Sequence, residues 1–279
     1  MRLFLLTALT MVAFAANSIL NRMALAGGGM DALVFGAVRL VAGAAMLAAL
    51  VVIARGGLRL GGPARVAGVG GLLAYIFAFS WAYLRLDAGV GALILFGVVQ
   101  ITMFAGGLLG GERPPVLRWL GAALAFGGLV WLLWPRAGVQ ISVPHGLAMA
   151  IAGVGWGVYS LAGRRASDPL MATAANFVFA APVGLVLGLA LMPGAAWDAA
   201  GLALAVLSGA VTSGLGYALW YSVLPKLAAS SAAVAQLTVP VIAMAGGMLF
   251  LSEALTLDFV LAAVLVLGGV GLSVLAGRR

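Results

Sequence analysis

Two stretches of the chain decide the fold: residues 106–128, GGLLGGERPPVLRWLGAALAFGG, and residues 246–269, GGMLFLSEALTLDFVLAAVLVLGG. In each stretch a glycine pair precedes a turn that contains one glutamate, and a second glycine pair ends the apolar run that follows. The two glutamates, Glu112 and Glu253, lie about 141 residues apart, and the final glycine pairs keep the same offset, which predicts two copies of one structural unit.

The composition excludes a soluble protein. Of the 279 residues, 65% are hydrophobic and 8% are charged, and the mean hydropathy is +1.21, whereas soluble proteins carry about 25% charged residues. The net charge of +8 does not indicate a nucleic-acid partner, because the basic residues lie between long apolar runs. With no cysteine and one histidine, the chain lacks a disulfide framework and an imidazole or thiolate metal cluster. The sequence therefore indicates an all-α polytopic membrane protein.

Ten apolar runs are long enough to cross a bilayer, which takes about 20 residues. The predicted spans are 3–24, 32–54, 64–86, 88–110, 115–134, 146–163, 170–192, 199–223, 228–251 and 256–276. They divide into repeat 1, residues 3–136, and repeat 2, residues 146–276, with five spans each. Because five is odd, the second repeat is predicted to be inverted in the membrane, with a central cavity between the two repeats. The alternative is a duplication that serves packing alone.

A second match, near the start of each repeat, supports the duplication. An aromatic residue, a serine and an arginine recur there at intervals of four residues: Phe14, Ser18 and Arg22 in repeat 1, and Trp156, Ser160 and Arg164 in repeat 2.

The stretch Ala13-Phe14-Ala15 also has the small residues of a signal-peptide cleavage site. Since the repeat needs this first span, we expect it to be retained.

The basic residues predict the orientation. If the spans alternate across the membrane, eleven Lys and Arg residues fall on the side of both termini, whereas only Arg22, Arg85 and Arg136 fall on the other side. The eleven are Arg2, Arg55, Arg59, Arg65, Arg113, Arg118, Arg164, Arg165, Lys226, Arg278 and Arg279. Cytoplasmic loops carry the excess of basic residues, so both termini are predicted to be cytoplasmic. Arg39 lies inside the second span, and we expect its side chain to snorkel to the outer surface.

The paired Gly-Gly…Glu…Gly-Gly segments, the small-residue-rich spans and the 5+5 repeat resemble the EamA-type branch of the drug/metabolite transporter superfamily, over essentially the whole chain. This resemblance implies a multi-pass protein of the bacterial inner membrane that exports small metabolites by alternating access. It implies a cavity lined by the third, fourth, eighth and ninth spans, with help from the first and sixth. The aromatic residues of the inner spans, including Trp156 and Tyr159, are similar to those of aromatic amino-acid exporters in this branch.

Amide side chains within the spans are candidates for substrate binding, because polar groups in a membrane are costly unless they face a cavity or a partner helix. Gln100, Gln236 and Asn17 lie in the fourth, ninth and first spans. An amide both donates and accepts hydrogen bonds, which suits the ammonium and carboxylate groups of a zwitterion. The alternative is hydrogen bonding between helices, worth about 0.6 kcal/mol for each bond.

Aromatic side chains are the second group of candidates. Tyr75 and Phe79 share one face of the third span, Trp156 and Tyr159 share a face of the sixth, and Tyr217 lies on an aromatic face of the eighth. These rings are predicted to stack on planar or apolar parts of a substrate. Aromatic packing between helices is the alternative for each of them, and Trp156 is the strongest candidate.

Several kinds of chemistry are missing from the sequence. No Walker loop and no Ser/His/Asp set can be assembled, so we expect no enzyme activity, no direct use of ATP, no cofactor and no metal. The seven acidic residues fall at span ends or in loops, which argues against proton coupling through an embedded carboxylate. Pro240, within the ninth predicted span, is the expected gate hinge.

The sequence therefore predicts an exporter of small metabolites, with amino acids that carry aromatic or bulky apolar side chains as expected substrates and uniport as the expected mechanism. Other metabolites or cationic drugs, a passive channel, and a non-transporting membrane scaffold are the alternatives. The expected partners are the small-molecule substrate and membrane lipids, and the sequence makes no prediction of the oligomeric state.

Overall fold

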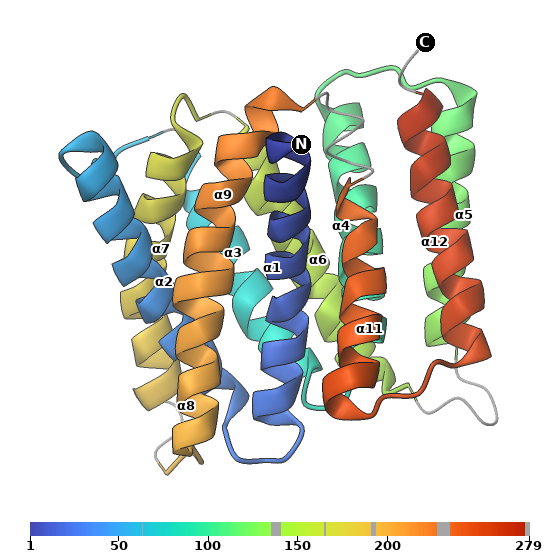
Figure 1. Cartoon of the computed structure of the whole chain (residues 1–279). Coiled ribbons are helices and arrows are strands. Elements are labelled where there is room, and N and C mark those ends of the chain that lie inside the picture. The colour runs from blue at the N-terminus through green and yellow to red at the C-terminus, as the bar shows by residue number, and fades with distance from the viewer. Residues whose placement is uncertain (63, 135–140, 165, 191–193, 228–234, 277–279) are drawn as a thin grey trace.

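The computed structural model describes all residues except 63, 135–140, 165, 191–193, 228–234 and 277–279, and the residues that it describes form helices and connecting loops without a strand (Figure 1). Nine of the described helical segments are long and apolar enough to cross a membrane. Seven of them are α1 (Arg2–Leu25), α2 (Ala32–Arg55), α3 (Arg65–Ala82), α4 (Ala88–Leu109), α5 (Val116–Leu133), α6 (Val143–Gly163) and α12 (Leu257–Ala276). The predicted all-helical membrane protein is confirmed for these residues.

The other two long segments change helix type along their length. The π-helical turn η1 (Val186–Ala190) continues α7 (Pro169–Leu185). The second segment is a continuous rod made of α8 (Ala199–Val206), π-helical η2 (Leu207–Leu215), α9 (Gly216–Val223) and the 3₁₀ turn η3 (Leu224–Lys226). Of the span predicted over residues 228–251, the structure describes the shorter apolar helix α11 (Thr238–Leu251). Residues 228–234 of that span lie outside the described residues.

Three helices begin at an aspartate whose side chain accepts a backbone N–H of the first turn. Asp31 caps α2 through the Leu33 N–H (2.7 Å), Asp168 caps α7 through the Met171 N–H (3.2 Å), and Asp198 caps α8 through the Gly201 N–H (2.6 Å). An N-cap side chain satisfies a helix donor that has no partner within the helix, and a carboxylate there also complements the helix dipole. These acids therefore mark where the apolar helices start.

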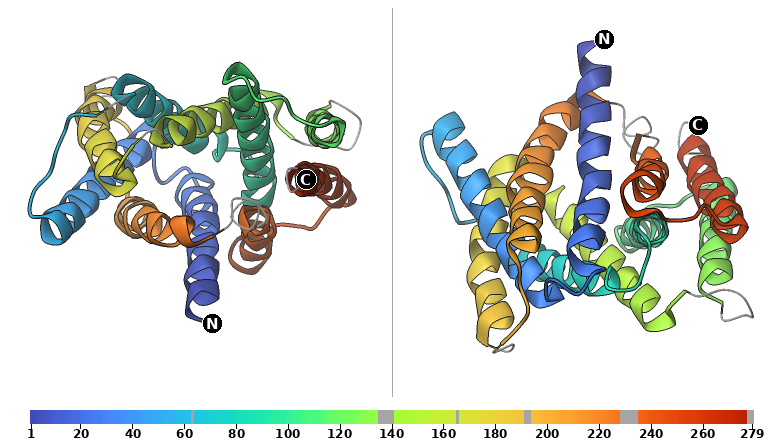
Figure 2. Two further views of the ribbon diagram at one scale, coloured as in Figure 1. Left: turned by 90° about the horizontal axis from the view of Figure 1, so that it is seen from above. Right: turned by 60° about the horizontal axis from the view of Figure 1, so that its bottom comes forward.

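Successive helices run antiparallel, so α1 begins at the same end of the bundle at which α12 ends (Figure 1). We call this the amino-terminal end and the other the opposite end. The α3 helix packs on α6 and the α8–η2–α9 rod packs on α1, while α4 packs on α6 and α11 packs on α1. The pairs α2 with α7 and α5 with α12 complete the bundle, and α5 and α12 lie together at its edge (Figure 2).

Glycines allow a close helix crossing in the interior, that of α3 with α6. A Cβ atom at Gly71 would lie 2.7 Å from the Gly155 carbonyl oxygen, and a Cβ at Gly155 would lie 2.7 Å from the Gly71 carbonyl oxygen and 2.7 Å from the Tyr75 amide nitrogen. Helix association within a membrane depends on this kind of close packing, since lipid gives no hydrophobic driving force between helices. The two glycines therefore hold the backbones of α3 and α6 in contact.

Gly71→Ala is expected to destabilise the protein, because the added methyl group would meet backbone atoms of α6, which cannot rotate away. Overpacking of this kind costs about 1–3 kcal/mol. Gly70→Ala is the matched control: Gly70 has no atom of a neighbour within 4 Å of its Cβ position, and alanine favours the helix by up to about 1 kcal/mol. Thermal unfolding in detergent should show a lower Tm for Gly71→Ala alone, and equal Tm values would contradict the close crossing.

Candidate functional site

A cavity of about 720 Å³ reaches into the bundle from the end at which α4 and α6 finish, which is the amino-terminal end. Its outer part is lined by Glu112 and Arg118 at the α4–α5 turn and by Arg164 at the end of α6. Other lining residues come from α1, α4, α5, α6, α9 and α12, so both predicted repeats contribute to its wall. A cavity of this size is in the range of small-molecule sites, about 300–1,000 Å³.

The inner wall of the cavity is aromatic. Phe14 of α1 makes edge contacts with Trp156 of α6 and with Tyr217 and Trp220 of α9, at ring-centroid distances of 6.4, 5.9 and 5.8 Å. Trp156 and Tyr217 lie 5.1 Å apart. All four side chains line the cavity. They present ring faces and edges against which an apolar or planar group can pack.

The structure brings four of the predicted site residues to this cavity: Gln100, Trp156, Tyr217 and Gln236 all line it. Tyr159 does not, because it is 2% exposed and lies behind Trp156, with the two rings stacked at 5.2 Å. Its hydroxyl donates to the Thr173 hydroxyl of α7 (2.8 Å). Tyr159 therefore supports the position of Trp156 in this conformation.

Three more predicted residues, Asn17, Tyr75 and Phe79, line a separate void of about 10 Å³, which Trp156 and Tyr217 also border. A void of that volume holds about one water molecule. The rings of Tyr75 and Trp156 are in contact across it, at a centroid distance of 4.9 Å. In this conformation an aromatic layer therefore separates these three residues from the main cavity.

Asn17 also joins helices. Its side-chain oxygen accepts hydrogen bonds from Ser208 (2.8 Å) and Thr212 (2.6 Å) of η2, and its backbone carbonyl accepts one from Asn21 (2.9 Å). The Asn21 side chain in turn accepts a hydrogen bond from Ser80 of α3 (3.0 Å). These contacts fit the alternative of hydrogen bonding between helices, and the role of Asn17 in substrate binding stays a prediction.

The expectation that Arg39 snorkels to the surface is wrong. Its side chain is 0% exposed and points into the bundle, where Nε donates to the Ser213 hydroxyl (3.1 Å) and Nη2 donates to the Tyr75 hydroxyl (2.9 Å). The guanidinium carbon lies 5.1 Å from the Tyr75 ring centre and 5.2 Å from that of Phe79. Hydrogen bonds and cation–π contacts inside the protein replace the water that a snorkelling side chain would reach.

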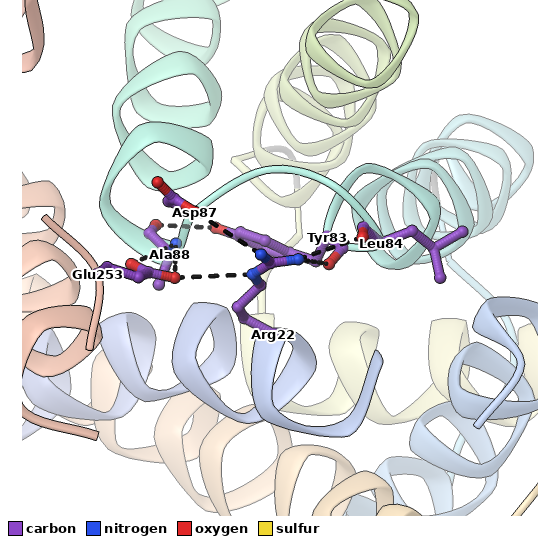
Figure 3. A network of polar contacts seen from close by, with 6 residues as sticks. All are labelled: Arg22, Tyr83, Leu84, Asp87, Ala88 and Glu253. Carbon is purple, nitrogen blue, oxygen red and sulfur yellow. Dashed lines mark hydrogen bonds and ion pairs between the residues drawn. The ribbon is translucent and has the colours of Figure 1, made fainter. Parts of the chain in front are cut away.

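A polar network joins three segments of the chain at the opposite end of the bundle (Figure 3). Arg22, at the end of α1, donates to the carbonyl oxygens of Tyr83 (3.1 Å) and Leu84 (3.2 Å) and forms ion pairs with Asp87 and Glu253, both at 3.7 Å. It therefore ties α1 to the α3–α4 loop and to the α11–α12 loop.

Glu253 also caps a helix of the other half of the chain. Both oxygens of its carboxylate accept the N–H of Ala88, the first residue of α4, at 2.9 Å. Burial raises the pKa of the Glu253 carboxyl above its usual value, and the nearby Asp87 carboxylate adds to this, whereas the Ala88 N–H and Arg22 act in the opposite direction. A carboxylate at a helix N-terminus complements the helix dipole, so the contact holds the α4 and α11 ends together.

Pro240 lies in the first turn of α11 and is buried. A proline in a first turn removes no hydrogen bond of the helix, so α11 itself is not interrupted there. The predicted gating role of Pro240 stays a prediction.

Sequence reasoning missed two parts of the site, the Phe14 wall and the Arg22–Glu253 network. A signal for Phe14 was present, because Phe14 matches Trp156 in the repeat, and the two residues face each other. Glu253 also carried a signal in its match to Glu112, but the loop that it reaches lies 165 residues away in the chain. Among the described residues, no group of three or more His, Cys, Asp or Glu side chains is arranged to hold a metal ion.

Arg22→Ala is expected to open the opposite end of the bundle, because it removes two hydrogen bonds and two ion pairs that tie three segments together. The chain has no cysteine, so Leu86→Cys, at a residue of the α3–α4 loop that is 2% exposed, gives a single reporter thiol. Arg22→Ala should raise the labelling rate of that thiol by about tenfold or more, equivalent to about 1.4 kcal/mol.

The control for that experiment is Arg113→Ala, at an exposed arginine of the α4–α5 turn. It should leave the labelling rate unchanged. An equal rate in the Arg22→Ala variant and its parent would show that the network does not hold this end closed.

Comparison with known proteins gives the following matches. Residues 145–275 match the EamA-like transporter family. The uncharacterized protein PA1977 of Pseudomonas aeruginosa is 48% identical over 279 residues, covering 99% of this chain and 96% of that protein. The aromatic amino acid exporter YddG of Ancylobacter novellus is 38% identical over 135 residues, or 47% of this chain and 45% of that protein.

A solved structure, described only as the crystal structure of a protein, matches with a TM-score of 0.67 and 23% identity, and the match covers 97% of both chains. At this identity it shows that the fold is shared.

Proposed function

Because residues 145–275 match the EamA-like transporter family, we propose that the chain is a transporter of that family and that it exports amino acids with aromatic or bulky apolar side chains across the membrane. The observation that carries this proposal is the cavity of about 720 Å³, whose inner wall is formed by Phe14, Trp156, Tyr217 and Trp220. Ring stacking and edge contacts of this kind contribute about 0.5–1.5 kcal/mol beyond the burial of area. The partial match to a protein named as an aromatic amino acid exporter supports the same substrate class.

The polar side chains of the cavity suit a zwitterion. Gln100 and Gln236 come from α4 and from the segment before α11, and they line the same cavity as the aromatic wall. Each amide can accept from an ammonium group and donate to a carboxylate without placing a formal charge in the membrane. We therefore propose that these two residues orient the substrate at the cavity wall.

We propose alternating access between two inverted repeats. The packing pairs support it: α3 on α6 corresponds to the α8–η2–α9 rod on α1, and α4 on α6 corresponds to α11 on α1. The α1 helix begins at the end of the bundle at which α6 finishes, as an inverted pair requires (Figure 1). In transporters built in this way, one repeat moves against the other around a site between them.

The two ends of the bundle differ as alternating access requires. Glu253 donates its backbone N–H to the Gly247 carbonyl (3.1 Å) and Glu112 donates its own to Gly107 (3.0 Å), so the two turns have the same local form. At the opposite end Glu253 pairs with Arg22, whereas at the amino-terminal end Glu112 lines the cavity and pairs with Arg118 of its own turn (3.2 Å). We interpret this conformation as closed at the opposite end and open toward the cytoplasm.

The proposed location is the bacterial inner membrane, with both termini in the cytoplasm. It rests on the excess of basic residues at the amino-terminal end and on the family.

The proposed mechanism is uniport, because all seven acidic residues lie within the described part of the chain, at helix ends or in loops. A carrier that moves protons generally needs a titratable group inside the membrane.

Trp156→Ala and Gln100→Ala are each expected to lower transport of an aromatic amino acid into proteoliposomes by about tenfold or more, a loss of about 1.4 kcal/mol. Trp134→Ala is the matched control, because Trp134 is 64% exposed and is not part of the cavity wall. Thermal unfolding checks that all three variants fold. Unchanged transport by both cavity variants would contradict the site.

The same assay tests the substrate class when it is run with a panel of amino acids and cationic drugs. Transport of a cationic drug but of no amino acid in the panel would favour that alternative substrate class.

Uniport predicts that the protein equilibrates its substrate and does not concentrate it. Proteoliposomes with equal substrate concentrations inside and outside should show no net uptake when a pH or sodium gradient is imposed. Steady accumulation that disappears when the gradient is collapsed would show that an ion is coupled and that the mechanism is wrong.

A further inference from the structure

Arg39 is a buried cation without a counter-ion. Its guanidinium is fully buried between α2, α3 and η2, and among the described residues it forms no ion pair with any acidic side chain. All seven acidic residues of the chain are described, so none of them is a hidden partner. Burial of an ion costs several kcal/mol unless it is compensated, and two of its three nitrogens are compensated by the hydrogen bonds that they donate to the Ser213 and Tyr75 hydroxyls.

The remaining hydrogen-bonding groups at this place also lack partners. Arg39 Nη1 and the hydroxyl of Tyr217 are buried and have no partner at normal hydrogen-bond geometry, although the Tyr217 hydroxyl lies close enough to interact with Arg39. Buried polar groups without a partner are rare in native proteins and require an explanation. Here one of them belongs to the guanidinium that lacks a counter-ion and the other lies beside it, which is the arrangement of an anion site.

The surroundings connect Arg39 to the cavity. Its guanidinium lies over the rings of Tyr75 and Phe79, which line the small void, and Tyr217 lines both that void and the main cavity. The void is about 10 Å³, too small for a carboxylate, so the site is occluded in this conformation. The rings of Tyr75, Trp156 and Tyr217 lie in contact beside the void, and a charge acts strongly through a medium of low dielectric constant.

We propose that Arg39, through Nη1 and together with the Tyr217 hydroxyl, binds the carboxylate of the transported amino acid after Trp156 and Tyr217 move apart. This inference rests on the proposed function and adds the group that recognises the carboxylate. Charge-assisted hydrogen bonds from a guanidinium to a carboxylate are about twice as strong as neutral ones. The substrate carboxylate supplies the missing counter-ion, while Tyr75 and Ser213 hold the guanidinium in place. The same charge disfavours a cationic drug at this depth.

The test compares ligands that differ only in the carboxylate. L-Tryptophan and tryptamine share the indole ring and the ammonium group, whereas only the amino acid has a carboxylate. Binding to the purified protein is measured by calorimetry, and we expect tryptophan to bind about tenfold or more tightly than tryptamine, as one charged hydrogen-bonded contact predicts. Equal affinities for the two ligands would overturn the proposal.

Arg39→Met removes the charge and keeps much of the volume, and removal of an unpaired buried charge should not unfold the protein. It should lower the affinity for tryptophan by about tenfold or more and leave that for tryptamine unchanged or improved. Tyr217→Phe removes one hydroxyl that has no hydrogen bond to lose, so it serves if Arg39→Met fails to fold, and it should lower tryptophan affinity alone. Arg65→Met is the matched control, at a partly buried arginine outside the site, and should change neither affinity.

A change of salt distinguishes a substrate carboxylate from an inorganic anion as the occupant of the site. Sodium chloride is replaced by sodium methanesulfonate, whose anion carries no carboxylate: a substrate carboxylate site should show the same tryptophan affinity in both salts. Competition by chloride that Arg39→Met abolishes would identify an inorganic anion as the occupant and overturn the proposal.

Failure of the proposed function can be distinguished from failure of the Arg39 site. Arg39-dependent binding of tryptophan without transport would contradict the exporter and support the site. Transport of tryptophan at the same rate by the Arg39→Met variant would support the exporter and contradict the Arg39 site.

Discussion

The close crossing of α3 and α6 at Gly71 and Gly155 sets the position of the candidate site. Tyr75 follows Gly71 by one helical turn and Trp156 follows Gly155 directly, so backbone contact at the glycines brings the two rings to 4.9 Å. A side chain at either glycine would push the helices apart and open this layer. Because lipid supplies no hydrophobic force between helices, packing at this crossing replaces the water-driven burial that orders the core of a soluble protein.

Four levels follow one another along the bundle. The cavity with its charged rim opens at the amino-terminal end, the aromatic layer lies below it, and Arg39 is held beneath the rings. The Arg22–Glu253 network then closes the opposite end. Each polar group costs free energy to bury, and the chain places its acids outside the apolar helices while it retains one arginine inside. That asymmetry makes the interior electropositive where a substrate anion would arrive.

Some of the site could be predicted from sequence because it depends on local periodicity. Spacing along a helix put Tyr75 and Phe79 on one face, and the position of Trp156 within an apolar span indicated an interior role. Matching the two halves paired Phe14 with Trp156, although their direct contact follows only from the packing of α1 near α6. Arg39 was misread because its hydrogen-bond partners, Tyr75 and Ser213, are 36 and 174 residues away in the chain.

The sequence by itself determined an all-helical membrane protein, since long apolar runs can satisfy their backbone hydrogen bonds within lipid only as helices. It also determined the duplicated pattern of glycine pairs and glutamates. Only the tertiary structure decided that Tyr159 supports Trp156 from behind, that Glu253 caps α4, and that Arg39 is buried without a counter-ion. The physical reason is that helix formation depends on neighbours a few residues away, whereas the environment of a charge depends on every helix packed around it.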